Sequence, residues 1–122
     1  MVIEYKENTK KKIDEFVHYI YKVTKSFPKE EIYITTSQLK RAALSVILNY
    51  VEGYARFKPG YQLQFLETAF GSLKETEYLV DFSYSEKFIK DNSEYQLLKS
   101  KINEISALIW TEIKAMRKTD EK

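Results

Sequence analysis

Hydrophobic residues recur at three- and four-residue spacing in four stretches of the chain, and helix-breaking residues separate these stretches. Pro28 stops the first stretch, the FKPG sequence at residues 57–60 stops the second, and polar residues at 91–93 stop the third. The spacing is typical of helices that bury one face. We therefore predict helices at about residues 8–26, 36–56, 61–85 and 93–118.

Helices of this length, joined by short connections, favour one architecture. Each is about 30 Å long, and four of them pack most readily side by side in alternating directions. The sequence thus predicts an all-α fold, an up-down-up-down antiparallel four-helix bundle that forms a single domain over residues 1–122. Two capping-box signatures mark helix starts, namely Thr35 with Gln38 and Ser93 with Gln96.

The second predicted helix carries a narrow polar arc beside a wide apolar face. Across an antiparallel hairpin that turns at residues 57–60, facing residues have numbers that sum to about 117. This relation places Ser45 near Ser72 and Asn49 near Thr68. It also predicts that Arg41 contacts Glu75, within one subunit or across an interface. The candidate polar network comprises Gln38, Arg41, Ser45, Asn49, Glu52, Arg56, Ser72 and Glu75.

Three interpretations of this polar arc remain open. The first, which we favour, is a structural network that fixes helix register or subunit assembly, because polar pairs between helices specify geometry better than they add stability. The second is a solvated surface, since polar residues on helices usually lie outside. The third is a catalytic site. The sequence therefore favours a role of the polar arc in packing or assembly over a catalytic role.

Composition argues against several classes of function. The chain has no Cys and a single His, His18, so thiolate metal sites, disulfides and a histidine-based triad are excluded. No Glu-x-x-His pair and no phosphate-binding glycine loop is present. We expect a protein that is not an enzyme and has no cofactor or metal.

The same composition bears on where the protein works. No apolar run approaches the about 20 residues of a membrane span. The lysines near the start of the chain follow its short apolar stretch, so we expect no signal peptide. The absence of cysteine fits a reducing compartment. We therefore expect a cytoplasmic protein with no membrane partner.

Positive charge gathers in the first half of a chain whose net charge is +2. On the first predicted helix Lys11, His18, Lys22 and Lys25 project along one line, and Glu15 is the only acid expected in it. In a monomer this line is an ordinary solvated face, whereas an oligomer repeats it and creates a field that attracts nucleic acid. The nucleic-acid-binding candidates are Lys10, Lys11, Lys12, Lys22, Lys25, Arg117 and Lys118.

Aromatic residues are more numerous than one small core needs. The chain has ten Tyr, seven Phe and one Trp, Trp110, and they cannot all face inward. Tyr and Trp are favoured at interfaces because they bury area and keep a polar group. Stacking on the bases of single-stranded nucleic acid is the alternative. We favour contacts between subunits.

Several segments resemble one known family. They are TKSFP at residues 24–28, QLKRAALSV at 38–46, NxxEG at 49–53, GYAR at 53–56 and FLETAFGSLKE at 65–75. These segments resemble the four-helix-bundle proteins encoded in intervening sequences of bacterial 23S ribosomal RNA genes. That family is similar to the accessory variability proteins of diversity-generating retroelements. One departure is Ile47-Leu48, where such proteins often carry smaller residues or proline.

The resemblance carries functional expectations that the residues alone do not. It implies a homo-oligomer, specifically a pentamer, with RNA or DNA and a reverse transcriptase as candidate partners and no enzymatic activity. Two hypotheses follow. In the first, the bundle is a non-enzymatic homo-oligomer that binds nucleic acid, or a nucleic-acid enzyme, through its basic surface. In the second, it is a structural or protein-interaction bundle with no nucleic-acid role.

Overall fold

The computed structural model describes residues 3–120, and most of them lie in four long helices. The helix bounds are Ile3–Thr24 for α1, Ser37–Ala55 for α2, Pro59–Ser85 for α3 and Asn92–Asp120 for α4. The prediction of four helices is confirmed, and each predicted helix overlaps its observed counterpart along most of its length. The largest difference is at α1, which begins five residues before the predicted start.

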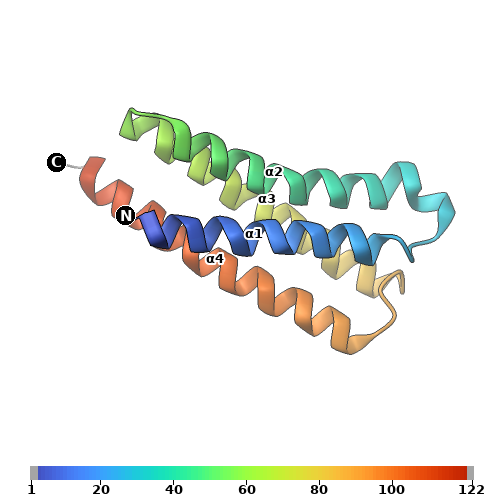
Figure 1. The fold of residues 1–122 in the computed structure, drawn as a ribbon. Helices are drawn as coiled ribbons and strands as arrows, with labels where there is room; N and C mark the ends of the chain where they lie inside the picture. Colours follow the sequence, from blue (N-terminus) through green and yellow to red (C-terminus); the bar gives the residue numbers. More distant parts are fainter. Residues whose placement is uncertain (1–2, 121–122) are drawn as a thin grey trace.

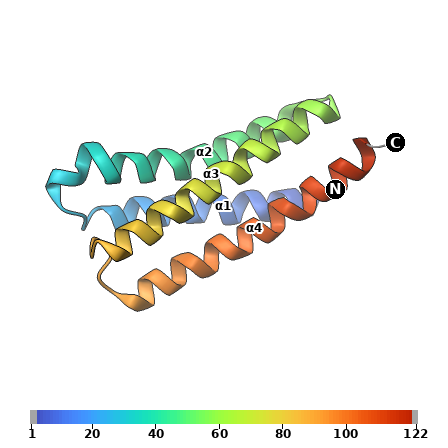
Figure 2. The ribbon, with the colours of Figure 1, turned by 180° about the vertical axis from the view of Figure 1, so that it is seen from behind.

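The four helices run side by side in alternating directions, so the predicted up-down-up-down bundle is confirmed (Figure 1). Each helix packs against its neighbours in the chain, and α1 also packs against α4, which closes the bundle. The view from behind shows α3 between α2 and α4, with α1 on the far side (Figure 2). The start of α1 and the end of α4 therefore lie at the same end of the bundle.

The core is a single cluster to which all four helices contribute at helical spacing. Ile13, Phe16 and Ile20 come from α1, and residues of the same kind recur along the other helices. The helices α2 and α3 lie close together at Gly53, where an added Cβ atom would lie 3.1 Å from the Cβ of Phe65. The glycine of the NxxEG segment thus allows α2 and α3 to pack tightly near their connecting turn.

The connection from α1 to α2 is also helical, which overturns one predicted cap. A 3₁₀ turn at Lys29–Glu31 continues into a π turn at Ile32–Thr36, which joins α2 directly. The backbone at Thr35 is therefore already helical, and the Thr35 hydroxyl donates to Glu31 Oε1 at 2.7 Å. The predicted capping box of Thr35 and Gln38 is wrong, because the capping side chain needs a non-helical backbone just before the helix.

The connection from α3 to α4 is a tight, anchored turn. Lys87, two residues after the end of α3, has a positive φ of 67°, a conformation common just after helix C-termini. The backbone N–H of Phe88 donates to the carbonyl of Ser83 at 2.8 Å, and Ile89 is buried in the core. At the start of α4, the Ser93 N–H donates to Asp91 Oδ1 at 2.9 Å. Asp91 supplies the capping carboxylate, so the capping role predicted for Ser93 is wrong.

Candidate nucleic-acid interface

The outward face of α1 carries the predicted line of cations, but acids interrupt it. Lys11 and Lys22 are exposed because they lie opposite the buried stripe of this helix, and Lys25, which follows its last residue, is exposed as well. Because α1 begins earlier than predicted, it also contains Glu4. Glu4 lies seven residues before Lys11, and residues seven apart on a helix share one face. Asp14 is exposed as well, and its Oδ1 lies 3.5 Å from Nε2 of His18. The expectation that Glu15 is the only acid in this line is therefore wrong.

The three consecutive lysines of α1 point in different directions. Successive residues on a helix are about 100° apart, so Lys10, Lys11 and Lys12 cannot share one face. Lys10 and Lys11 are exposed, whereas Lys12 turns toward α4 and places its Nζ 3.3 Å from Glu104 Oε1. Only part of this run is available to bind phosphate groups.

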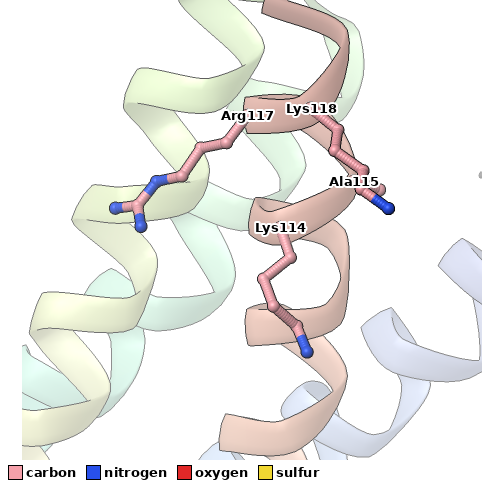
Figure 3. Close-up of a pocket in the computed structure, with 4 residues that line it drawn as sticks. All are labelled: Lys114, Ala115, Arg117 and Lys118. Atoms are coloured by element: carbon pink, nitrogen blue, oxygen red, sulfur yellow. The ribbon is translucent and has the colours of Figure 1, made fainter. Parts of the chain in front are cut away.

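The end of α4 carries a second group of cations. Lys114, Ala115, Arg117 and Lys118 line a shallow hollow of about 470 Å³ (Figure 3). Arg117 extends toward α3, where its guanidinium donates to Glu67 Oε2 at 2.7 Å, while Lys118 points away from α3. Lys114 was not among the sequence candidates. Its position four residues before Lys118 is the signal that pairs the two on one face.

These cations do not form one continuous surface. Lys12 lies level with Glu104, which is 13 residues before Arg117 and so about 20 Å from it along α4. Lys22 lies in the last turn of α1 and Lys25 follows it, and this end of α1 is at the opposite end of the bundle from the end of α4 (Figure 1). The structure therefore separates the sequence candidates into an α1 group interrupted by acids and a compact group at the end of α4.

The polar arc of α2 meets α3 as predicted at its centre. The hydroxyl oxygens of Ser45 and Ser72 are 2.8 Å apart, which confirms the predicted facing pair. Asn49 does not reach across to Thr68; its Nδ2 donates within α2, to the backbone carbonyl of Ser45 at 2.8 Å. The Thr68 hydroxyl likewise donates within its own helix, to the carbonyl of Gln64.

The outer members of the arc lie in solvent. Arg56 forms an ion pair with Glu52 one turn away on the same helix. Gln38, Arg41 and Glu75 are exposed. Among residues 3–118, Arg41 and Glu75 form no ion pair with each other, so their predicted contact within one subunit is wrong. A contact between them across an interface stays a prediction.

The structure contains a buried ionic cluster that the sequence interpretation missed. Glu112 of α4 is fully buried; its Oε1 accepts from Lys6 Nζ at 2.9 Å, and its Oε2 accepts from the Tyr50 hydroxyl at 2.6 Å. Burial, and then the bond to Glu112, raises the pKa of the Tyr50 hydroxyl. One signal was present in the sequence: Glu112 lies seven residues after Ile105, on the apolar stripe of its helix.

Metal sites and membrane-spanning helices are both absent from the described residues. In that part of the chain no three His, Asp or Glu side chains are placed to hold a metal ion together. None of the helices there is both long and apolar enough to cross a membrane. The candidate functional residues are thus those of the basic groups, the polar arc and the buried cluster.

Comparison with known proteins identifies the family. The model of the 23S rRNA-intervening sequence protein family matches residues 6–111. The chain belongs to this family. The match to the 23S rRNA-intervening sequence family spans α1, α2, α3 and most of α4. It includes the residues of the polar network on both α2 and α3. It also includes Lys6 of the buried cluster, while Glu112 follows the last matched residue.

A solved structure is similar to the whole fold. It is a protein of unknown function from the S23 ribosomal protein family of Bacteroides thetaiotaomicron, described at 1.70 Å resolution. The TM-score is 0.83 at 22% identity, and the match covers 90% of this chain and 98% of the other. At this level of identity the likeness shows the fold. A comparison with curated proteins finds no match.

Proposed function

We propose that this member of the 23S rRNA-intervening sequence family is a non-enzymatic homo-oligomer whose subunits join through the outer face of α2. The observation that carries this proposal is a stripe of exposed apolar side chains on that helix. Leu44, Leu48 and Val51 are 38%, 59% and 40% exposed. Their spacing of four and three residues places them on one face, opposite the buried side of α2. Contiguous exposed apolar side chains are typical of protein interfaces.

The proposed assembly is a ring of five subunits that binds nucleic acid. The number five comes from the resemblance to accessory variability proteins. Nucleic-acid binding is supported by the cations at the end of α4, because among residues 3–118 no carboxylate lies within ion-pair distance of Lys114 or Lys118. A ring repeats this group in every subunit, and the repeated charges add to the attraction for phosphates. A reverse transcriptase is the proposed protein partner.

Light scattering coupled to size exclusion tests the assembly. The unmodified protein should elute with the mass of five subunits, and Leu48→Glu should elute as a monomer because it places a charge in the apolar stripe. Leu97→Glu is the matched control, since Leu97 is an exposed leucine on α4. Circular dichroism should show unchanged helicity in both variants. A monomeric unmodified protein contradicts the ring, and a dimer contradicts the number five alone.

Fluorescence anisotropy with labelled RNA and DNA tests the nucleic-acid role. Binding should be largely independent of sequence and should weaken with salt, with a logarithmic slope of about −0.7 per phosphate contact on single strands. Reversing Lys114 and Lys118 to Glu should weaken binding more than reversing Lys11, Lys22 and Lys25, because acids already interrupt the α1 group. An absence of binding at low salt favours the alternative, a structural or protein-interaction bundle.

A further inference from the structure

A second hollow, of about 440 Å³, lies between α3 and α4 and contains an aromatic pair. Phe70 and Trp110 line it together with Asn103, Ser106 and Ala107. The two rings are 5.8 Å apart between centroids and inclined at 44°, and Trp110 is 37% exposed. Partly exposed aromatic faces beside an open space are suited to stacking with a flat ligand.

Two cations lie over this aromatic pair. The Arg117 guanidinium carbon is 5.2 Å from the centre of the Trp110 ring, and Lys74 Nζ is 5.2 Å from the centre of the Phe70 ring. On α4, Arg117 follows Trp110 by two helical turns, and on α3, Lys74 follows Phe70 by one turn. Arg117 also lines the basic hollow at the end of α4, so one cation contacts both that hollow and the Trp110 ring.

We infer that the hollow between α3 and α4 receives an unpaired base of single-stranded nucleic acid. Phe70 and Trp110 supply the stacking surface, as aromatic side chains do in proteins that bind single strands. The amide of Asn103 and the hydroxyl of Ser106 both donate and accept hydrogen bonds, which suits the edges of bases. Arg117 and Lys74 contact the flanking phosphates. This assignment rests on the proposed nucleic-acid function and adds the strand type and the contact residues.

The carboxylates near the hollow are compatible with this ligand. Arg117 pairs with Glu67 at 2.7 Å, and Lys74 lies 3.6 Å from Glu77. Both cations are about half exposed, and exposed ion pairs add little stability, so a phosphate can displace the carboxylate. Glu77 has a second partner, because its other carboxylate oxygen accepts from Lys99 at 2.9 Å.

The position of the hollow distinguishes it from the proposed subunit interface. That interface lies on the outer face of α2, and α2 packs mainly on α1 and α3. The hollow lies between α3 and α4, and in Figure 2 α3 lies between α4 and α2. The hollow is therefore a different surface from the apolar stripe of α2.

Trp110 is the single tryptophan of the chain, so its fluorescence reports on this hollow alone. The probe is a single-stranded oligonucleotide of about ten nucleotides, within the site sizes of single-strand-binding proteins. It should quench Trp110 emission at low salt, because a base stacks on the indole. A duplex of the same sequence should quench little, since its bases are paired. An abasic strand of the same length, which keeps the phosphates, should bind without quenching.

Substitutions in the hollow provide the second measurement. Trp110→Leu should weaken single-strand binding by about 5- to 150-fold, the usual effect of losing one stacked base. Tyr78→Leu is the control, because Tyr78 is 66% exposed on α3 and does not line the hollow. Asn103→Asp keeps an exposed side chain of the same size and adds a negative charge, so it should also weaken binding without unfolding the bundle.

The outcomes separate this inference from the proposed function. If single strands bind without quenching Trp110, and if Trp110→Leu and Asn103→Asp bind equally well, the hollow is not the base site, while the proposed function stands. If no nucleic acid binds at low salt, both fail. If Trp110 emission changes with protein concentration and not with nucleic acid, the hollow is an interface between subunits and the inference is overturned.

Discussion

Two polar clusters in this bundle differ in charge and in how they connect the helices. The Lys6–Tyr50–Glu112 cluster surrounds a fully buried carboxylate and joins α1, α2 and α4, with only Lys6 partly exposed. The Ser45–Ser72 pair lies at the edge of α2 and α3, and most residues around it bond within their own helix or face solvent. The comparison shows that burial, more than the number of polar groups, decides which cluster the fold depends on.

The difference has a clear electrostatic basis. A buried carboxylate has lost its hydration and depends on the two groups that donate to it. An exposed hydroxyl or guanidinium exchanges its partner for water at little cost. The removal of one partner should therefore cause a large loss of stability in the buried cluster and a small loss in the Ser45–Ser72 pair. The following changes are ordered from the largest expected effect to the smallest.

Lys6→Met should lower the free energy of unfolding by about 3 kcal/mol, because it leaves Glu112 buried without a cation. Urea denaturation followed by circular dichroism measures the change. The triple variant Lys6→Met, Tyr50→Phe, Glu112→Leu should return to within about 1 kcal/mol of the unmodified protein, since it removes all three partners together. A triple variant as unstable as the single one would show that shape, rather than charge, dominates this cluster.

Tyr50→Phe should change how stability depends on alkaline pH. The pKa of the Tyr50 hydroxyl is raised above its ordinary value of 10.0 in the folded protein, so the group stabilises the fold below that pH and loses this contribution as the pH rises. For this one group the free energy of unfolding should fall by about 1.4 kcal/mol per pH unit above the ordinary pKa. Urea titrations on both sides of pH 10.0 should give the variant a correspondingly shallower slope. Parallel slopes would contradict the assignment.

Ser72→Ala should lower the free energy of unfolding by about 1 kcal/mol, because it removes one hydrogen bond at the edge of the core. Thr68→Ala on the exposed part of α3 is the matched control and should change stability less. Both are measured by thermal and urea unfolding. A loss for Ser72→Ala as large as that for Lys6→Met would remove the contrast between the two clusters.

Arg41→Leu should change the stability of an isolated subunit by no more than about 0.5 kcal/mol, as exposed substitutions usually do. The contact between Arg41 and Glu75 across an interface is tested separately, by oligomer mass. Arg41→Glu should lower the mass, and adding Glu75→Arg should restore it, because the exchanged charges again attract. Equal masses for all three proteins would rule out this intersubunit pair.

Much of the fold could be predicted because periodicity and chain breakers act locally. Pro28 and the FKPG turn marked real boundaries, and the facing of Ser45 and Ser72 followed from the hairpin geometry alone. The errors came from structure that continues where a break was expected. The π turn that runs into α2 removed the cap at Thr35, and Asp91 rather than Ser93 caps α4.

The candidate sites were harder to predict, because they depend on contacts between distant residues. Lys6 lies outside the predicted first helix, so helical spacing gives no face on which to place it near Glu112. Arg117 is among the cations that the sequence suggests, but its carboxylate neighbour Glu67 and its contact with the Trp110 ring arise only when α3 and α4 pack. Helical spacing gives the face of a residue and not the partner that the face meets.

The joining of Lys6 to Glu112 has a consequence for biosynthesis. The two residues are 106 positions apart, so the lysine leaves the ribosome long before the carboxylate that neutralises it in the core. Contacts between such distant positions form late in folding, because a long loop must close first. A nascent chain that has released only α1, α2 and α3 exposes the apolar side on which α4 lies. We therefore expect nascent chains at this stage to engage chaperones, and products truncated before α4 to be degraded.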